Sequence, residues 1–426
     1  MNEALFRQNP RLGELSERLV QARLRGELLL QAGDEGWCSA PSNIALLKYW
    51  GKKAGLQQIP VNSSLSLTLG AFRAYTRITA RGRFLPLMDG QVPSSIERPH
   101  FSLYLNGHDA LMPSKMEVFL KSVLHGYADD IALSVESLNN FPTACGVASS
   151  AAGYAALVGA VADLLNIKRF LSESELQFWL TEWARLGSGS ATRSAVPVHS
   201  SETSQYVAWE LAADGKSSIT TEVSAHSRFA NMQHCVLVLD AAEKTVGSSE
   251  GHLLAQTSVL QDIRLAQYPQ RIVDFRSALV SGDFRTVRQL SELDAFEMHA
   301  VMLSGATRLE YMNRKTARAI AQFISLRDAH SAHMFWTLDA GANPHFLFLP
   351  DAAPFMAEFF ESLLHIDDFQ DAIVLAGQTA GRAIEVGKTD SMQAALKNSN
   401  SCSELKKMSL SVAVRSFLEG VQDAPR

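Results

Sequence analysis

The segment from Asn139 to Gly153 constrains the fold of this 426-residue chain more than any other. Its sequence, NNFPTACGVASSAAG, places a polar loop of small residues directly before an alanine-rich stretch with helical periodicity. A helix that begins here gathers free backbone N–H groups, serine hydroxyls and the positive end of its dipole, an arrangement that binds phosphate. No residue from 137 to 162 is charged. The segment therefore predicts a site for a nucleotide or phosphorylated metabolite whose full charges come from elsewhere in the chain.

Composition is that of an ordinary globular protein with two or three domains, with 46% hydrophobic and 19% charged residues. The net charge of -5 gives no support for nucleic-acid binding. Four cysteines lack a CxxC pair or metal-ligand spacing, which favours buried thiols in a reducing compartment. The first thirty residues alternate charges with leucines, unlike a signal peptide, and polar residues interrupt the uncharged run too often for a membrane span. We expect a soluble cytoplasmic protein without membrane contact.

Hydrophobic periodicity divides the chain into a β-rich first block and a helix-rich second block. The first block has predicted helices over 1–32, 115–127, 151–165 and 172–186, and strands over 37–49, 64–69, 74–80 and 101–105. In the second we expect strands over 233–240, 333–338 and 344–349, helices over 249–265, 268–281, 283–304, 309–326 and 353–364, and a polar tail after 387. The seam near 222–231 predicts an α+β fold of two lobes, 1–227 and 228–426, with a cleft between them.

Basic residues concentrate in the segment 40–53, which carries Lys48, Lys52 and Lys53. No acidic residue occurs between Glu35 and Asp89, a bias that suits a phosphate-rich ligand. Lys48 and Lys52 are expected to share one face of the segment. A solvated lysine cluster would explain the same composition.

Two further turns carry charged groups that suit a cleft. The glycine- and serine-rich turn 185–194 presents Ser188, Ser190 and Arg193, and a guanidinium is a natural clamp for carboxylate or phosphate. Asp339 ends an apolar strand and precedes a small-residue turn. The plainer interpretations are a helix cap with a surface arginine and an Asx-turn between two strands. The turn 244–251 adds Ser248 and Ser249.

The order and wording of these segments resemble a known family. The loop 142–152 looks like the phosphate-binding motif of the GHMP kinase superfamily, and NIALLKYWGKK, VNSSLSLTL, NNFPTACGVASSAAGYAAL, ARLGSGSATRS and DAGANP, within 43–344, resemble diphosphomevalonate decarboxylases. The resemblance implies a GHMP-kinase fold, with a ribosomal-protein-S5-like α/β lobe before an α+β lobe and the active site between them. It also implies a homodimer and a decarboxylation of mevalonate 5-diphosphate to isopentenyl diphosphate, ADP, phosphate and CO₂ that uses ATP and Mg²⁺.

The same resemblance assigns roles to residues. Asp339, Lys48 and Arg193 would be catalytic, with Asp339 beside the substrate's 3-hydroxyl, Lys48 keeping it ionised and Arg193 orienting the carboxylate. Asn43, Asn62 and Ser63 would shape the pocket floor. Substrate contacts would come from Tyr49, Lys52, Ser188, Gly189, Ser190, Arg193, Ser248 and Ser249. The phosphates of ATP would lie against Pro142, Gly146, Ala148, Ser149, Ser150 and Ala151, with Ser150 a candidate Mg²⁺ contact.

Several positions depart from the family's usual wording. Val147 follows Gly146 where leucine is usual, Ala54 and Gly55 follow the lysines where an acid is common, and the aspartate turn reads AGANPH. These differences leave open a mevalonate 5-phosphate decarboxylase, a kinase that stops at the 3-phosphate, or an inactive binding protein on the same fold. Retention of Asp339, Arg193 and Lys48 favours the complete decarboxylation, and Tyr49 with Lys52 favours a diphosphate substrate.

Overall fold

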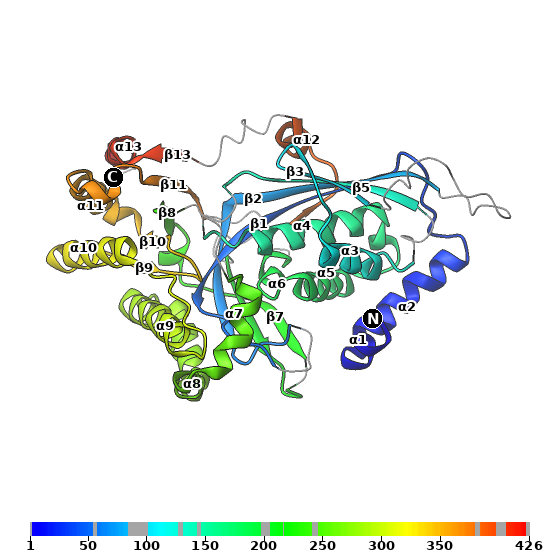
Figure 1. Ribbon diagram of the computed structural model, residues 1–426, viewed down its shortest axis with the longest axis horizontal. Helices are drawn as coiled ribbons and strands as arrows, with labels where there is room; N and C mark the ends of the chain where they lie inside the picture. Colours follow the sequence, from blue (N-terminus) through cyan, green and yellow to red (C-terminus); the bar gives the residue numbers. More distant parts are fainter. Residues whose placement is uncertain are drawn as a thin grey trace.

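Two β-sheets organise the chain in the computed structural model (Figure 1). The structure describes residues 2–53, 58–83, 101–126, 131–142, 146–196, 205–215, 217–240, 246–379, 384–397 and 406–422. The mixture of helices and two sheets confirms the predicted α+β class. Within these described ranges, no helix combines the length and the apolar character that crossing a membrane requires.

The first sheet is built around two long antiparallel strands, β1 (Glu35–Leu47) and β2 (Ser64–Arg83). Its order is β12-β1-β2-β5-β3-β4, and β6 and β7 extend it from β2. Only the β3–β5 pair in this sheet is parallel among the described strands. The shorter strands are β3 (Phe101–Leu105), β4 (His108–Ala110), β5 (Ile131–Asn139), β6 (Tyr206–Leu211), β7 (Ser218–Val223) and β12 (Glu385–Val386).

The helices of the first half lie below this sheet in Figure 1, with α4 (Ser149–Leu164) against β1 and β2. Small residues make this contact possible. A Cβ on Gly159 would lie 2.2 Å from the Cys38 sulfur, and one on Gly36 would lie 2.1 Å from the Ala160 carbonyl oxygen. The neighbouring helices are α1 (Asn2–Gln8), α2 (Pro10–Leu24), α3 (Ser114–Val123), α5 (Glu173–Gly187) and α6 (Ala191–Ser194).

The second sheet is antiparallel, in the order β13-β11-β8-β10-β9. Its strands are β8 (Gln233–Val238), β9 (Met334–Thr337), β10 (His345–Phe348), β11 (Ile373–Gln378) and β13 (Lys406–Ser409). The helices are α7 (Ser248–Leu254), α8 (Val259–Ser281), α9 (Phe284–Ser304), α10 (Arg314–His330), α11 (Ala353–Leu364), α12 (Asp390–Lys397) and α13 (Leu410–Gln422). Short 3-10 turns cover Ile167–Arg169, Ser227–Phe229, Ala255–Thr257, Pro350–Ala352 and Asp367–Phe369.

Most predicted elements are confirmed, and four expectations are corrected. The predicted helix 249–265 is divided, because α7 ends at Leu254, a 3-10 turn follows and α8 begins at Val259. The ranges 64–69 and 74–80 belong to the single strand β2. The predicted break before Tyr268 is wrong, because α8 continues through Pro269, which lies on the exposed side of the helix. The polar tail contains α12, β13 and α13, and β13 completes the edge of the second sheet.

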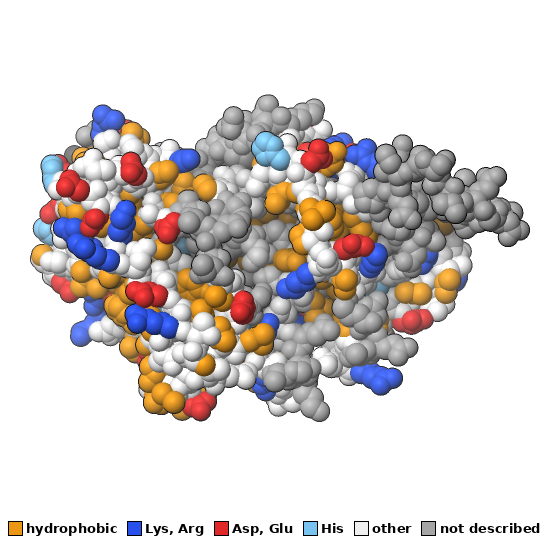
Figure 2. All heavy atoms as spheres, in the orientation of Figure 1, with side chains coloured by type: hydrophobic (Ala, Val, Ile, Leu, Met, Phe, Trp, Pro, Cys, Tyr) orange, Lys and Arg blue, Asp and Glu red, His pale blue; other side chains and the backbone are white. Residues whose placement is uncertain are grey.

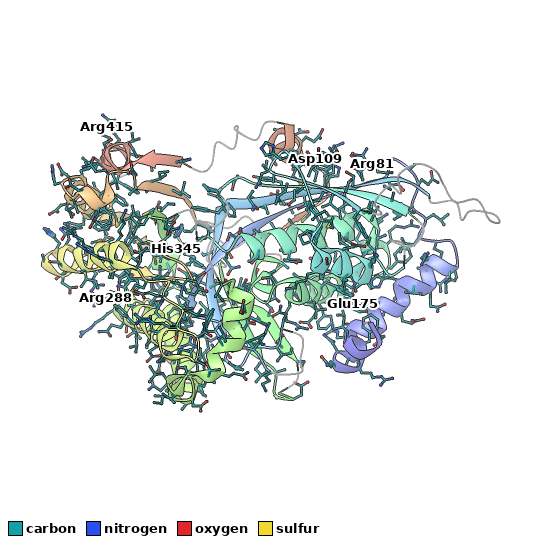
Figure 3. The ribbon with its side chains drawn as sticks, viewed as in Figure 1. Arg81, Asp109, Glu175, Arg288, His345 and Arg415 are labelled. Carbon is teal, nitrogen blue, oxygen red and sulfur yellow. The ribbon has the colours of Figure 1, made fainter. Side chains whose placement is uncertain are left out.

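The division at 227/228 stays a prediction. Between β7 and β8 the chain passes from the first sheet to the second, which agrees with the predicted seam. The late strand β12, however, returns to pair with β1. His345 on β10 lies in the interior near the junction of the sheets, whereas Arg288 and Arg415 lie towards the periphery (Figure 3).

Candidate active site

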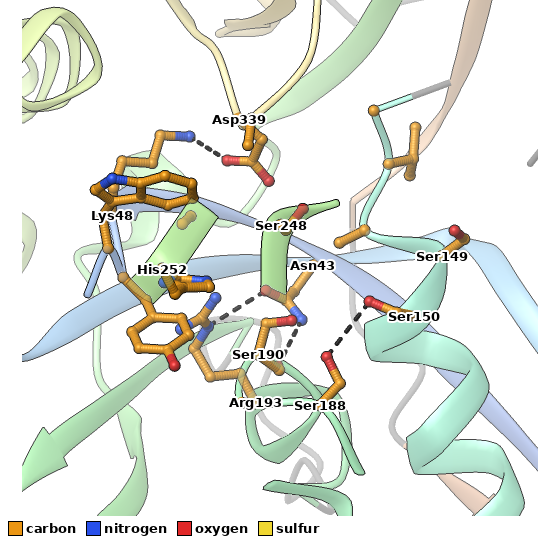
Figure 4. Close-up of a pocket in the computed structure, with 18 of the residues that line it drawn as sticks. Asn43, Lys48, Ser149, Ser150, Ser188, Ser190, Arg193, Ser248, His252 and Asp339 are labelled. Carbon is orange, nitrogen blue, oxygen red and sulfur yellow. Dashed lines mark hydrogen bonds and ion pairs between the residues drawn. The ribbon is translucent and has the colours of Figure 1, made fainter. Parts of the chain in front are cut away.

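A cavity of about 200 Å³ opens where five separate segments meet (Figure 4). Its walls are the end of β1 with the residues that follow it, the N-terminus of α4, the α5–α6 turn, helix α7 and the turn after β9. The lining residues lie within 43–50, 146–150, 188–193, 248–252 and 339–340, with Gln58 and Met298. All five of the predicted polar segments therefore contribute to the cavity, although they are far apart in the sequence.

Lys48 and Asp339 form an ion pair at one end of this cavity, with Nζ 2.6 Å from Oδ1. The lysine side chain is 2% exposed and the aspartate side chain 26%, so only the carboxylate faces the cavity appreciably. Burial raises the pKa of Asp339, but Lys48 and other nearby basic groups outweigh burial and hold the pKa below its ordinary value. Asp339 is therefore an ionised carboxylate at neutral pH. The interpretation of Lys48 as part of a solvated cluster is wrong.

The turn that carries Asp339 is fixed by groups other than its own carboxylate. The Asp339 carbonyl accepts a hydrogen bond from the Gly341 amide at 2.7 Å and lies 3.2 Å from Nε2 of His299. Asn343 closes the turn, since its Oδ1 accepts from the amides of Leu239 and Asp240 at 2.8 and 3.0 Å. Asn343 thus ties the turn to the residues that follow β8, and the Asp339 carboxylate pairs with Lys48 instead of capping its own turn.

Arg193 is buried in the opposite wall and makes hydrogen bonds to neutral groups. Its Nε donates to Oδ1 of Asn43 at 3.2 Å and its Nη1 to Oγ of Ser64 at 2.6 Å. Asn43 is held in turn by its Nδ2, which donates to Oγ of Ser194 at 2.8 Å and to the Ser190 carbonyl at 3.3 Å. Burial lowers the pKa of Arg193 to about 10, so the guanidinium remains charged at neutral pH.

An aromatic group forms the wall beside Arg193. Tyr49 stacks on His252 with ring centroids 4.0 Å apart and meets Trp209 edge-on at 4.7 Å. Gly189 is required here, because a Cβ would lie 2.9 Å from the Tyr49 ring. The Tyr49 hydroxyl is buried, and none of the described residues forms a hydrogen bond with it; burial raises the pKa of this phenol. Burial and nearby cations lower the pKa of His252 to about 3, so its imidazole is neutral.

The N-terminus of α4 supplies the uncharged end of the cavity. Ala148 precedes the helix in the left-handed region at φ 34°, and Ser149 begins it. Oγ of Ser150 lies 3.3 Å from Oγ of Ser188, so hydroxyls of two segments face each other. Gly146, at φ 88°, passes close to the Asp339 turn, since a Cβ there would lie 3.5 Å from Cβ of Asn343.

The structure brings most predicted site residues to the cavity, but some lie outside its lining. Lys52 and Lys48 do not share the cavity, because β1 ends at Leu47 and Lys52 forms a separate bridge with Pro60. Pro142 is exposed away from the lining, and Ala151 is buried within α4. The Ser249 side chain, the loop 143–145 and Lys244 lie outside the described residues. The cavity lining includes Lys48, Tyr49, Gly146, Ala148, Ser149, Ser150, Ser188, Gly189, Ser190, Arg193, Ser248 and Asp339.

Sequence reasoning missed His252, Trp50 and Met298 as lining residues. His252 follows the serine-bearing turn by one helical turn, and this spacing was the available signal. Met298 projects from the long helix α9, where a methionine looks like any core residue. Ser64, which holds Arg193, had no signal beyond its place at the start of a strand.

The geometry of the cavity is that of a phosphoryl-transfer site. One ionised acid paired with a lysine, a buried arginine with neutral partners, and hydroxyls at a helix N-terminus form a cleft suited to phosphoryl transfer to a small molecule. Together with two α+β halves, this site agrees with the GHMP-kinase type of protein that the sequence resembles.

Two family models match the chain in succession. Residues 40–220 match the diphosphomevalonate decarboxylase-like N-terminal domain, and residues 234–418 match the mevalonate 5-diphosphate decarboxylase C-terminal domain. The chain belongs to the diphosphomevalonate decarboxylase family. The diphosphomevalonate decarboxylase of Saccharomyces cerevisiae is 34% identical over 323 residues, which are 74% of this chain and 77% of the yeast protein.

Solved structures agree with this family. The mevalonate diphosphate decarboxylase of Staphylococcus aureus has a TM-score of 0.69 and 26% identity, and the match covers 83% of this chain and 98% of that one. A structure described as MDDEF in complex with MVAPP, AMPPCP and magnesium has a TM-score of 0.68 and 28% identity, and covers 84% of this chain and 100% of that one.

Proposed function

We propose that this protein decarboxylates mevalonate 5-diphosphate in an ATP-dependent reaction that yields isopentenyl diphosphate, ADP, phosphate and CO₂. The observation that carries the proposal is the ion pair between Lys48 and Asp339 at the end of a cavity whose far wall holds Arg193. Family membership over both halves of the chain supports the same activity.

Asp339 would act on the substrate's 3-hydroxyl. Its carboxylate orients the hydroxyl for transfer of the γ-phosphoryl group and accepts the proton as the new O–P bond forms. The 3-phosphate then leaves with the C3–O electron pair, and the positive charge at C3 draws in the electrons of the adjacent C–C bond. The carboxylate departs as CO₂ and those electrons become the new double bond. Because Lys48 lowers the pKa of Asp339, we assign this carboxylate an electrostatic and orienting role as much as a basic one.

Arg193 would bind the substrate carboxylate and hold it in line with C3. Its hydrogen bonds to Asn43 and Ser64 fix the guanidinium plane, and neither partner neutralises its charge. Tyr49 offers a buried hydroxyl that no described residue of the chain binds, which suits a substrate phosphate oxygen. Ser188, Gly189, Ser190, Ser248 and Ser249 complete the proposed substrate contacts, and Lys52 would reach the diphosphate from outside the cavity lining.

ATP would place its phosphates at the N-terminus of α4. Ser149, Ser150 and the amides near Gly146 present donors there without a fixed charge, as a phosphate cradle requires. Within the described residues no three acidic, histidine or cysteine side chains cluster as a metal site. Mg²⁺ commonly binds through phosphate oxygens and few protein ligands, so the Ser150 hydroxyl together with ATP fits this ion. When bound, the ion would neutralise charge on the transferring phosphoryl group.

Pro142 and Ala151 would border the nucleotide site without lining the cavity. The two lobes at 1–227 and 228–426, a homodimeric assembly and a cytoplasmic location complete the proposal. Light scattering of the purified protein and fractionation of cells test the assembly and the location.

A substrate panel tests the function directly. Purified protein receives ATP, Mg²⁺ and either mevalonate 5-diphosphate or mevalonate 5-phosphate, and ADP and CO₂ are measured together. Equal release of ADP and CO₂ from the diphosphate is expected. Release of ADP alone would identify a kinase, faster turnover of the monophosphate would identify the other decarboxylase, and absence of turnover with intact ligand binding would refute catalysis.

A further inference from the structure

A buried ionic cluster lies behind Lys48, on the side away from the cavity. Its centre is Asp294 on α9, which is 0% exposed. The Asp294 carboxylate accepts from Nη2 of Arg264 at 3.1 Å and Nη1 of Arg271 at 2.8 Å, and it lies 2.9 Å from the Tyr268 hydroxyl. Arg271 also binds Glu297 at 2.5 Å, and Glu297 marks the solvent side of the cluster.

This cluster holds the backbone of Lys48 on both sides. The Lys48 amide donates to Oδ2 of Asp294 at 2.5 Å. The Lys48 carbonyl accepts from Nη2 of Arg264 and from Nδ2 of Asn62, each at 2.9 Å. The Tyr268 oxygen also lies 2.9 Å from this carbonyl, and its single O–H donates either to the carbonyl or to Asp294. The next residues leave β1, so ordinary strand pairing does not fix this peptide, and side chains of α8 and α9 replace it.

We propose that Asp294, Arg264 and Tyr268 are positioning residues for the reaction, which set where the Lys48 ammonium meets the Asp339 carboxylate. The inference rests on the function proposed for the Lys48–Asp339 pair. Lys48 enters from the first half of the chain and Asp339 from the second. Because side chains of α8 and α9 form hydrogen bonds with the Lys48 backbone, the cluster fixes the lysine relative to the half of the chain that carries Asp339.

Stability alone is a poor explanation for such a cluster. Buried ion pairs often contribute little, because desolvation offsets their attraction, and apolar replacements can be equally stable. An apolar cluster could not satisfy the Lys48 amide and carbonyl, however, and both groups are buried. The specific contribution of the cluster is therefore the placement of one peptide.

The placement of Lys48 should affect the pH at which activity is lost on the basic side of the pH profile of kcat/KM. Burial lowers the pKa of Lys48, and both Asp339 and Asp294 oppose that shift. Arg193 also faces Lys48 and lowers its pKa. His299 and His345, which lie near Lys48 as well, are neutral because burial lowers the pKa of each to about 4. A looser Lys48–Asp339 pair thus lowers the pKa of Lys48, so activity is lost at a lower pH.

The test compares two conservative substitutions with a matched control. Tyr268→Phe removes one hydroxyl and keeps every charge, and Asp294→Asn removes the central charge. Glu297→Gln changes a carboxylate of the same cluster that does not contact Lys48. We measure kcat, KM for ATP and for mevalonate 5-diphosphate, the pH dependence of kcat/KM between pH 6 and 10, and the thermal midpoint. Turnover by the unsubstituted protein tests the proposed function separately.

In Tyr268→Phe we expect kcat to fall about fivefold, equivalent to about 1 kcal/mol, with KM for both substrates little changed and the basic limb at lower pH. Asp294→Asn should show larger changes in the same directions, and Glu297→Gln should match the unsubstituted enzyme. If Asp294→Asn does not fold, Tyr268→Phe decides. An unchanged kcat and basic limb in Tyr268→Phe, or equal changes in Glu297→Gln, would overturn the inference.

Discussion

Replacement of Asp339 by asparagine tests the centre of the proposed site. The substitution keeps the shape of the side chain and its ability to accept a hydrogen bond from Lys48, but it removes the negative charge. Asparagine also cannot take the proton of a substrate hydroxyl. The change therefore isolates the charge and basicity of Asp339 from its volume.

The magnitude follows from the geometry of the pair. A positioned acid or base contributes about 10²–10⁴-fold to a rate, and the 2.6 Å contact with Lys48 fixes this carboxylate firmly. We therefore expect kcat to fall about 10³-fold, which corresponds to about 4 kcal/mol of the activation barrier.

The substitution should lower the free energy of unfolding by less than it raises the activation barrier. Removing one partner of a fully buried ion pair costs about 3–5 kcal/mol. Asp339 is 26% exposed, and burial lowers the pKa of Lys48, so cavity water and loss of the lysine proton both reduce the cost. We therefore expect the free energy of unfolding to fall by about 2 kcal/mol, less than for a fully buried ion pair.

The assay combines coupled ADP detection, CO₂ release, calorimetric ATP binding and chemical denaturation. ATP affinity should stay within about threefold, because the α4 N-terminus is untouched, and threefold is about 0.7 kcal/mol. Asp328→Asn is the control, since Asp328 forms surface ion pairs with Arg327 and Arg288 at 2.8 and 3.6 Å and should leave kcat unchanged. A kcat for Asp339→Asn within about tenfold of the original would refute the role assigned to this carboxylate.

Two further substitutions test other parts of the structure. In Ser150→Ala we expect KM for ATP to rise about tenfold, about 1.4 kcal/mol, while stability changes by less than about 0.5 kcal/mol because Ser150 is exposed; an unchanged KM would contradict the phosphate role. Burial lowers the pKa of His125, His299 and His345 from 6.5 to about 4, so each contributes stability that is present above pH 6.5 and is lost as the pH falls towards 4, by about 1.4 kcal/mol per pH unit. Urea denaturation from pH 7.5 to 5 should show this loss, and His125→Phe should reduce its slope by one histidine's share; an equal slope would contradict the assignment.

Local chemistry explains which elements were predictable. Ser172 and Glu175 form a complete capping box at the start of α5, as their spacing predicts. Asn106 and Gly107 both adopt positive φ, 51° and 83°, and join β3 to β4 as an Asn-Gly turn should. In these cases a few adjacent residues determine the conformation.

Longer-range packing explains the elements that the sequence did not predict. Nothing near residue 385 in sequence indicates that β12 pairs with β1, because that pairing depends on how the whole C-terminal segment returns to the first sheet. The break expected between residues 265 and 268 is absent, since α8 continues through this stretch and through Pro269.

In the site, too, the sequence predicts which residues take part but not which of them pair with each other. The sequence identified Lys48, Arg193 and Asp339 as candidate charges, but the ion pair joins residues 291 positions apart. Asp294 was not singled out, since an acid within the charged segment SELDAFE looks like a solvated helix face. Its complete burial depends on two arginines of α8 that approach from another helix.

Lys48 and Arg193, the two cations that line the cavity, differ in whether a carboxylate compensates their charge. Lys48 is neutralised by Asp339, so its ammonium adds little net attraction for an anion. Arg193 is buried against the neutral groups of Asn43 and Ser64, and its lowered pKa reflects the cost of that burial. An anion beside Arg193 would relieve this cost, whereas an anion beside Lys48 would compete with Asp339. In the described part of the chain no carboxylate pairs directly with Arg193, so its positive charge lies where the substrate carboxylate is proposed to bind. The balanced pair lies where the hydroxyl is proposed to react.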